Sequence, residues 1–249
     1  MDLLTGDPFI PIHEFTPPIN KESIIIITAT IGSPYLNQCM ESVRAQSLKN
    51  VAIYHYIIVD GPQYYKKVSD IYEKNKNENT KLITLPENTG FSMWNGHRIY
   101  AAFTWLCNSD YICFLDDDNW FDNTHLEELY KLISIQKLDW VYSLRKIYDN
   151  NTGKIVEDKC ESLGILGAPY DRPTEVLIDT SCYLIKKDIA IRVSMAWNIQ
   201  YYADRVLSQL LIENFKLRAC TMNHTLNYRI GNNHLKIEYF EYGNKIKSY

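Results

Sequence analysis

Apolar and polar residues follow one another in blocks of strand and helix length along the first half of the chain. Residues 23–31 are almost entirely Ile, Thr and Ala, apolar toward both sides, a pattern typical of a buried strand in a parallel sheet. Ser33-Pro34 follows, a pair that favours a helix start as N-cap and first helical residue. The helix is predicted to place four residues at core spacing: Leu36, Cys39, Met40 and Val43.

The same order of strand and helix then repeats. Strands are predicted over 53–59, 82–85 and 111–115, with helices over 64–75 and 91–107 between them. The second of these helices is expected to bury Ile99, Ala102, Phe103 and Leu106, and a further helix carries the stripe Leu126, Leu129, Tyr130 and Ile133. This alternation predicts right-handed crossovers and an α/β fold: a mostly parallel, Rossmann-like central sheet with helices on both faces.

Beyond residue 140 the alternation becomes less regular. Strands are predicted over 141–144 and 178–185, with a turn at 150–153 and an irregular stretch over 155–178 between them. A helix over about 201–213 would bury Ala203, Val206, Leu207, Leu210 and Leu211. No linker divides the chain, so a single domain is expected.

Composition and charge exclude several classes of protein. The 249 residues carry 26 Lys+Arg and 30 Asp+Glu, a net charge of -4, which argues against a nucleic-acid binder. The apolar runs, such as residues 24–27, are far shorter than the ~20 residues of a membrane span. The N-terminus shows no secretory signal pattern, and the six cysteines form no CxxC pair. These features predict reduced thiols and a cytoplasmic location.

Hydroxyl and carboxylate side chains collect where the predicted strands end. Thr28 and Thr30, Asp60 and the run 116–118 all fall at the carboxyl edge of the sheet, where ligands of such folds bind. Three adjacent aspartates repel one another, so they need either solvent or a cation, and Mg²⁺ or Mn²⁺ is the kind of ion that carboxylates hold. An EF-hand calcium loop is excluded, because Trp120 and Phe121 stand where a ligand and glycine are required.

Five segments together resemble the family 2 glycosyltransferases, nucleotide-sugar-dependent enzymes with the GT-A fold. They are the first strand with Thr28-Ala-Thr30, ESVRAQS (41–47), IIVDGP (57–62), Glu87-Asn88-Thr89-Gly90, and the aspartate run as the D-x-D motif. Ala203-Asp204-Arg205 is similar to the family's E-D motif, with Ala in place of the first acid. Trp94-Asn95-Gly96 stands where the family has an Arg-Asn pair. The resemblance covers about residues 22–214.

The resemblance implies a role for each matching residue. Thr28, Thr30, Asp60, Asn95, Asp116 and Asp117 would contact the nucleotide; Asp118, with Asp116, would hold the metal; Asp204 would be the general base. A late metal-binding histidine would be His224 or His234. It also implies a nucleotide-binding half over about 23–120 and an acceptor-binding half over about 121–214. An extended arm (1–22) would precede them, and a segment packed on the domain (215–249) would follow.

The implied reaction is the metal-dependent, inverting transfer of a sugar from a nucleoside-diphosphate sugar to an acceptor hydroxyl, such as that of a glycan. Three alternatives stay open. A nucleotidyltransferase would usually have a basic phosphate loop after the first strand, which residues 30–34 lack. A glycoside hydrolase also uses two carboxylates. A degenerate nucleotide-sugar-binding module would fit the alanine at 203. Sugar, base, acceptor and oligomeric state stay undetermined at this point.

Individual residues have simpler interpretations as well. Asp204 could act only as an acid in the first turn of its helix, and Asp60 could cap the Gly61-Pro62 turn. Trp94, Trp120 and Trp197 could stack on a sugar ring, although isolated aromatic residues more often belong to the core.

Overall fold

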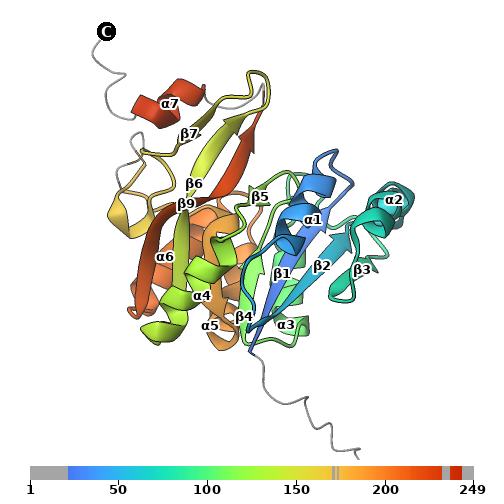
Figure 1. Cartoon of the computed structure of the whole chain (residues 1–249), viewed down its shortest axis with the longest axis horizontal. Helices are drawn as coiled ribbons and strands as arrows, with labels where there is room; N and C mark the ends of the chain where they lie inside the picture. Colours follow the sequence, from blue (N-terminus) through green and yellow to red (C-terminus); the bar gives the residue numbers. More distant parts are fainter. Residues whose placement is uncertain (1–21, 170–171, 173, 232–235, 243–249) are drawn as a thin grey trace, which may run out of the picture.

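The isoleucine-rich run forms strand β1 (Ser23–Thr30), which lies inside a nine-stranded sheet. The sheet order is β3-β2-β1-β4-β8-β6-β9-β5, and β7 pairs with β6 outside this path (Figure 1). Residues 24–27 are buried, as the apolar pattern on both sides of the strand requires. The computed structural model describes residues 22–169, 172, 174–231 and 236–242.

The first half of the sheet has the predicted parallel arrangement. Strands β2 (Ala52–Val59) and β4 (Tyr111–Phe114) flank β1, and β3 (Thr80–Thr84) extends the sheet beyond β2, all in parallel register. The connections contain α1 (Leu36–Arg44), the 3₁₀ turn η1 (Pro62–Tyr64), α2 (Tyr65–Asn75) and α3 (His97–Leu106). The carboxyl ends of β1, β2 and β4 therefore meet at one edge.

The second half of the sheet is mixed. Strand β8 (Tyr183–Lys186) is antiparallel to both β4 and β6 (Trp140–Asp149), whereas β9 (Arg218–Ile230) is parallel to β6. Strands β5 (Trp120–Phe121) and β7 (Ile155–Glu157) add antiparallel pairs to β9 and β6. The sheet is therefore fully parallel, as predicted, in the half that carries the N-terminal motifs, and mixed in the other half.

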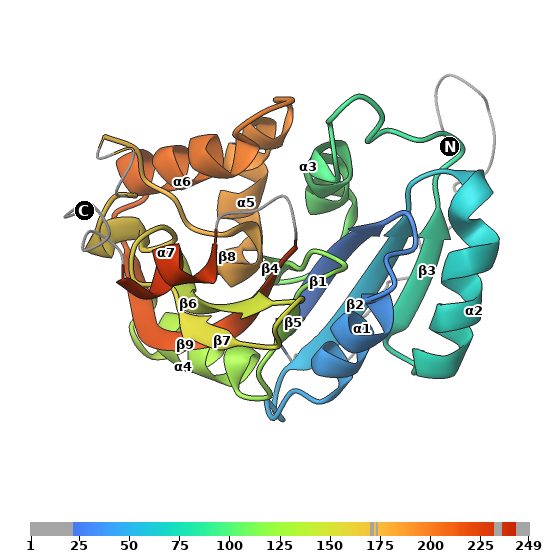
Figure 2. The same cartoon turned by 90° about the horizontal axis from the view of Figure 1, so that it is seen from above.

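Helices cover both faces of the sheet, as predicted. Seen from above, α1 and α4 (His125–Ile135) lie on one side, and α3, α5 (Lys187–Val193) and α6 (Ala203–Asn214) lie on the other (Figure 2). The short helix α7 (Ile237–Tyr242) packs on β6 and β7 at the far end, over a small core of its own. Three 3₁₀ turns complete the chain: η2 (Gly164–Leu166), η3 (Thr180–Cys182) and η4 (Ser194–Trp197).

Two predicted helix starts are wrong. Helix α1 begins at Leu36, and the hydroxyl of Ser33 accepts a hydrogen bond from the Tyr35 amide ahead of it. Helix α3 begins at His97 rather than near residue 91, because residues 91–96 form turns. The buried face of α3 is consequently different: Ile99, Tyr100, Phe103 and Thr104 are buried, while Ala102 and Leu106 are exposed.

The segment after residue 214 also differs from the prediction. Strand β9 lies within the sheet, between β6 and β5, so residues 218–230 belong to the domain instead of packing on its outside.

The predicted arm lies outside the described residues, except for Glu22. All six cysteines are free thiols, and five of them are buried.

None of the described helices has the length and apolar character that a membrane crossing needs.

Candidate functional site

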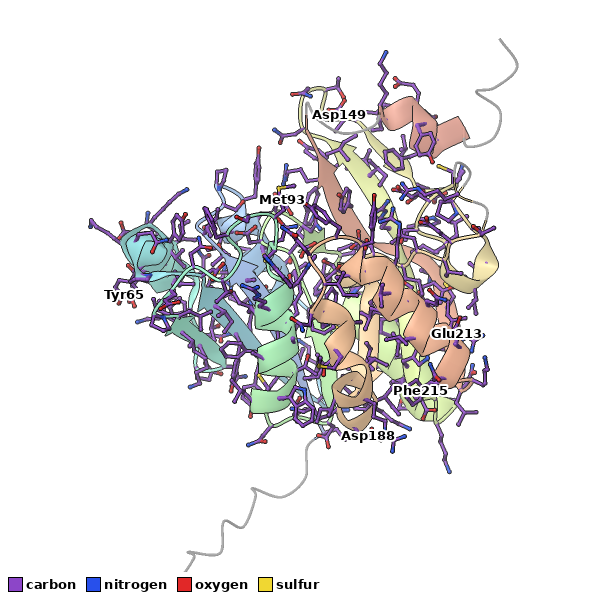
Figure 3. All side chains as sticks on the ribbon, turned by 180° about the vertical axis from the view of Figure 1, so that it is seen from behind. Tyr65, Met93, Asp149, Asp188, Glu213 and Phe215 are labelled. Atoms are coloured by element: carbon purple, nitrogen blue, oxygen red, sulfur yellow. The ribbon has the colours of Figure 1, made fainter. Side chains whose placement is uncertain are left out.

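A cleft of about 740 Å³ opens at the carboxyl edge of the parallel strands. Its size is in the usual range for small-molecule sites, roughly 300–1,000 Å³. The loops that precede α3 and α6 reach toward each other on one side of the sheet (Figure 2), where His97 Nδ1 and the Ile199 carbonyl are 2.9 Å apart. Met93, labelled in Figure 3, lies on the loop that leads into α3 and lines the cleft.

Acidic side chains dominate the lining of this cleft. Seven carboxylates line it: Asp60, Asp116, Asp117, Asp118, Glu161, Asp179 and Asp204. Among the described lining residues, only Arg145 and Arg205 carry a permanent positive charge. A diphosphate entering this cleft would meet net negative charge, so its binding calls for an added cation.

The aspartate run is held in place by β1 and α3. The Tyr100 hydroxyl, on α3, donates to Asp116 at 2.6 Å. The Thr30 hydroxyl donates to Asp117 at 2.5 Å, and the Ser33 amide donates to the same oxygen at 3.3 Å. No side chain in the described part of the chain donates a hydrogen bond to the Asp118 carboxylate. The fold therefore anchors two of the three carboxylates and leaves the third open to the cleft.

Burial of these acids disfavours their charged forms. Burial raises the pKa of Asp118 to about 6, and repulsion from the Asp117 carboxylate adds to the shift. The pKa of Asp116 is raised well above its usual value by burial, then by the carboxylates of Asp179 and Asp118. A bound cation would relieve this repulsion directly.

Asp60 holds the loop that leads toward α3. Its carboxylate accepts from the Thr89 amide at 2.6 Å, the Thr89 hydroxyl at 2.9 Å and the Gly90 amide at 2.7 Å. A Cβ on Gly90 would lie 2.3 Å from the Asn95 carbonyl oxygen and 2.8 Å from an Asp60 oxygen, so only glycine fits there. Asn95, with a left-handed φ of 49°, lines the cleft on this loop. The predicted Asp60 and Asn95 are thus brought together.

Asp204 lies in the first turn of α6 and also lines the cleft. Its carboxylate accepts from the Arg205 amide at 2.9 Å. Burial raises the pKa of Asp204, and the positive charge of Arg205 opposes the shift. The neighbouring Ala203 is fully buried in the core, so the residue at this position does not face the cleft.

Two predicted residues lie away from the cleft. Thr28 lies two residues before Thr30 in β1 and is fully buried. Its hydroxyl lies 2.9 Å from His55 Nε2. His224, on β9, does not line the cleft, and its Nδ1 lies 3.8 Å from a Glu157 oxygen. The structure does not bring either one to the aspartate run. His234 lies outside the described residues.

His55, the partner of Thr28, provides a test of stability against pH. Burial lowers the pKa of His55 to about 3, whereas an unfolded histidine titrates near ~6.5. Below pH ~6.5 the unfolded chain takes up a proton that the folded chain excludes, so acid lowers the free energy of unfolding. His55→Gln removes this effect. We expect the stability difference between wild type and variant to shrink by roughly 2 kcal/mol from pH 7 to pH 5 in urea unfolding. A difference that is constant over this range would contradict the assignment.

Sequence reasoning missed a buried arginine in the wall of the cleft. Arg145, on β6, donates to Asp158 at 2.8 Å and to Asp179 at 2.7 Å, and also contacts Glu161. Its guanidinium lies 4.4 Å from the centre of the Tyr228 ring. No local pattern could reveal this cluster, because its members come from β6, β9 and the irregular stretch between β7 and β8.

A second arginine, Arg229 on β9, fixes the backbone of the aspartate run. Its Nε donates to the Asp118 carbonyl at 3.0 Å, and its amide donates to Asn119 Oδ1 at 3.0 Å. The guanidinium also donates to Gln38 at 2.6 Å and lies 3.8 Å from the centre of the Tyr35 ring. Arg229 therefore ties β9 and α1 to the residue that opens into the cleft.

Arg229→Lys keeps the positive charge but lacks the planar guanidinium. We expect it to lose the hydrogen bonds to the Asp118 carbonyl and to Gln38. We expect a loss of stability of roughly 1–3 kcal/mol in urea unfolding, with weaker nucleotide binding in titration calorimetry. Arg98→Lys is the matched control, since Arg98 stacks 3.8 Å from the centre of the Trp94 ring on the exposed surface. An Arg229 variant as stable as the Arg98 variant would contradict the role given to Arg229.

The residues of the cleft fit a hard divalent cation. Asp118 supplies an open carboxylate, and its pKa of about 6 reflects the burial and repulsion that a cation would offset. Within the described residues, no three His, Cys, Asp or Glu side chains are grouped so as to hold a metal ion by themselves. Mg²⁺ and Mn²⁺ typically bind one or two carboxylates and complete their coordination with phosphate oxygens and water.

Comparison with known proteins agrees with this architecture. The model of glycosyl transferase family 2 matches residues 23–194, and the chain belongs to this family of glycosyltransferases. No curated protein resembles the chain in sequence.

Solved structures with the same fold include S. aureus TarS 1-349 in complex with UDP, with a TM-score of 0.62 at 10% identity. The match covers 84% of this chain and 60% of that one. S. aureus TarS 1-349 in complex with UDP-GlcNAc gives 0.61 at 12% identity, covering 87% and 60%. This chain thus spans about 60% of the length of those two chains. The predicted GT-A fold is confirmed.

Proposed function

We propose that this glycosyltransferase moves a sugar from a nucleoside-diphosphate sugar to an acceptor hydroxyl, with Mn²⁺ or Mg²⁺ as cofactor. The observation that carries the proposal is the open carboxylate of Asp118 in a cleft with a surplus of acids. Asp118 would hold the cation, with Asp116 as a second ligand. When bound, the cation would neutralise the charge that develops on the departing diphosphate.

The donor would bind over the ends of β1, β2 and β4. Thr30 and Asp117 form one wall there, and Asp60 keeps the loop with Asn95 in position at the other. The complexes of TarS with UDP and UDP-GlcNAc, which share this fold, support a nucleotide sugar as the donor. Thr28 and His224 are not retained in the proposed site, because they do not line the cleft.

Asp204 would act as the general base. Its raised pKa makes it a stronger base than an ordinary aspartate, and it lies in the cleft on α6, apart from the aspartate run after β4. An acceptor hydroxyl that loses its proton to Asp204 would attack the sugar in line with the departing diphosphate, which inverts the anomeric centre.

The burial of Ala203 favours an active enzyme over a degenerate binding module, since an acid at that position would not reach the cleft. The six free thiols favour a reducing compartment such as the cytoplasm.

Thermal unfolding with and without Mn²⁺ tests the proposal. UDP, GDP and dTDP and the corresponding sugar nucleotides would each be added to the metal-free protein and to the protein with Mn²⁺. We expect at least one nucleotide to raise the melting temperature in the presence of Mn²⁺ and to have little effect in EDTA. The absence of any metal-dependent shift across this set would overturn the proposal.

A further inference from the structure

The ring of Tyr202 stands at the mouth of the cleft, two residues before Asp204. Its side chain lines the cleft, and the residue is 62% exposed. The neighbouring Tyr201 is 53% exposed and lines the cleft as well. By contrast, Trp197 is buried in the core, and neither Trp94 nor Trp120 lines the cleft. The open aromatic surface of the site is therefore supplied by Tyr201 and Tyr202 next to α6 and by Phe91, which is 77% exposed, on the loop before α3.

The backbone of Tyr202 is strained for a residue with a bulky side chain. Its φ of 63° and ψ of 24° are left-handed, an uncommon conformation for a bulky residue. It occupies the N-cap of α6, yet its side chain forms no capping hydrogen bond. Only its carbonyl is used there, accepting from the amides of Arg205 and Val206 at 3.1 Å each. Glycine would adopt this conformation at lower cost, so the turn itself does not require the tyrosine ring.

Neighbouring side chains restrain the ring and surround it with polar groups. The Arg205 guanidinium lies 5.1 Å from the ring centre, and Arg205 is itself held by Glu175 at 2.8 Å. Gln200 lines the same mouth and donates to the Ser92 carbonyl, which joins the loops on the two sides. An aromatic face with polar groups around it is complementary to a pyranose ring, which has apolar C–H faces and hydroxyl edges.

Tyr202 comes from a different element than the residues proposed to hold the donor. The aspartate run, Thr30 and Asp60 lie at the ends of β4, β1 and β2, whereas Tyr202 comes from the start of α6, next to the proposed base. We propose that Tyr202 forms an acceptor subsite that stacks on a pyranose ring, so the acceptor of this enzyme is a cyclic sugar, such as the end of a glycan. This inference rests on the proposed function, because it takes Asp204 as the group that receives the acceptor proton.

Saturation-transfer NMR with defined sugars tests the proposal. The probes are methyl β-D-glucopyranoside, methyl β-D-galactopyranoside and methyl N-acetyl-β-D-glucosaminide, with sorbitol as an acyclic polyol that has no ring face. Each would be added to the protein with Mn²⁺ and the nucleoside diphosphate that gives the largest thermal shift. We expect saturation of ring C–H protons for at least one glycoside and none for sorbitol.

Three variants separate stacking from folding. Tyr202→Gly relieves the left-handed strain, so its melting temperature should equal or exceed that of wild type, while glycoside affinity falls about two- to tenfold. Tyr202→Phe should bind like wild type. Tyr65→Ala is the control, since Tyr65 is a 51% exposed tyrosine on α2, away from the cleft (Figure 3).

Each contrary outcome has a distinct meaning. Equal saturation of sorbitol and glycosides, or unchanged glycoside affinity in Tyr202→Gly, would overturn the subsite. Failure of every glycoside to bind, while the nucleotide does bind, would also overturn the subsite. The proposed function would stand in that case. If no nucleoside diphosphate gives its own saturation signal, the proposed function fails together with the subsite.

Discussion

Asp204→Asn is expected to abolish sugar transfer and leave nucleotide binding intact. Asparagine has nearly the same shape and can still accept from the Arg205 amide, but it cannot take a proton from an acceptor hydroxyl. Loss of a general base typically lowers the rate by about 10²–10⁴-fold. The transfer rate would be measured as the release of the nucleoside diphosphate. The substrate would be the sugar nucleotide that shifts the melting temperature most. Titration calorimetry would measure nucleotide binding.

Asp188→Asn is the matched control for this change. Asp188 is also an acid in the first turn of a helix, α5, but it is exposed and lies outside the cleft (Figure 3). Both variants lose the same interaction with a helix N-terminus, worth about 0.3–1 kcal/mol. Only Asp204→Asn should lose activity. Full transfer activity in Asp204→Asn would rule out Asp204 as the base.

Asp118→Asn should weaken metal-dependent nucleotide binding and sugar transfer together. The variant removes the one carboxylate of the run that no side chain in the described residues anchors by a hydrogen bond, so a cation would lose one of its two proposed protein ligands. We expect the Mn²⁺-dependent thermal shift to disappear and the transfer rate to fall by at least about 10²-fold.

The metal-free Asp118→Asn protein should be at least as stable as wild type at pH 7. The pKa of Asp118 is raised to about 6, so its charge at neutral pH opposes folding. Asp149→Asn, at the end of β6 (Figure 3), is the control and should keep the metal-dependent shift. Retention of that shift in Asp118→Asn would show that the cation binds elsewhere.

The parallel half of the fold was predictable because its strands carry uninterrupted apolar residues. Residues 24–27 and 111–114 are buried on both sides, so they are apolar throughout, and the motifs at their ends fall at one edge. Asp60 and the aspartate run meet in the cleft for this reason, whereas Asn95 and Asp204 reach it from the loop before α3 and from the start of α6. Thr28 shares a strand face with Thr30, but α1 covers it, and Cys39 lies 3.9 Å from its hydroxyl.

The elements that sequence reasoning missed have polar residues in buried positions. On β9, Asn227 donates to Asp122 at 2.8 Å and Arg229 fixes the aspartate run, so this inner strand lacks an apolar pattern. On α3, the turns before His97 delay the helix start, and the inward face carries Tyr100, whose hydroxyl reaches Asp116. Such residues are set by tertiary contacts, which a local periodicity does not contain.

A crystal of the protein grown with MnCl₂ and the best-binding nucleoside diphosphate would show whether Asp118 holds the metal beside the nucleotide. Anomalous diffraction locates manganese without any assumption about the reaction. We expect one manganese peak in the cleft, in direct contact with the Asp118 carboxylate and with phosphate oxygens of the nucleotide. A nucleotide bound in the cleft with no manganese beside Asp118, or a nucleotide bound at another surface, would contradict it.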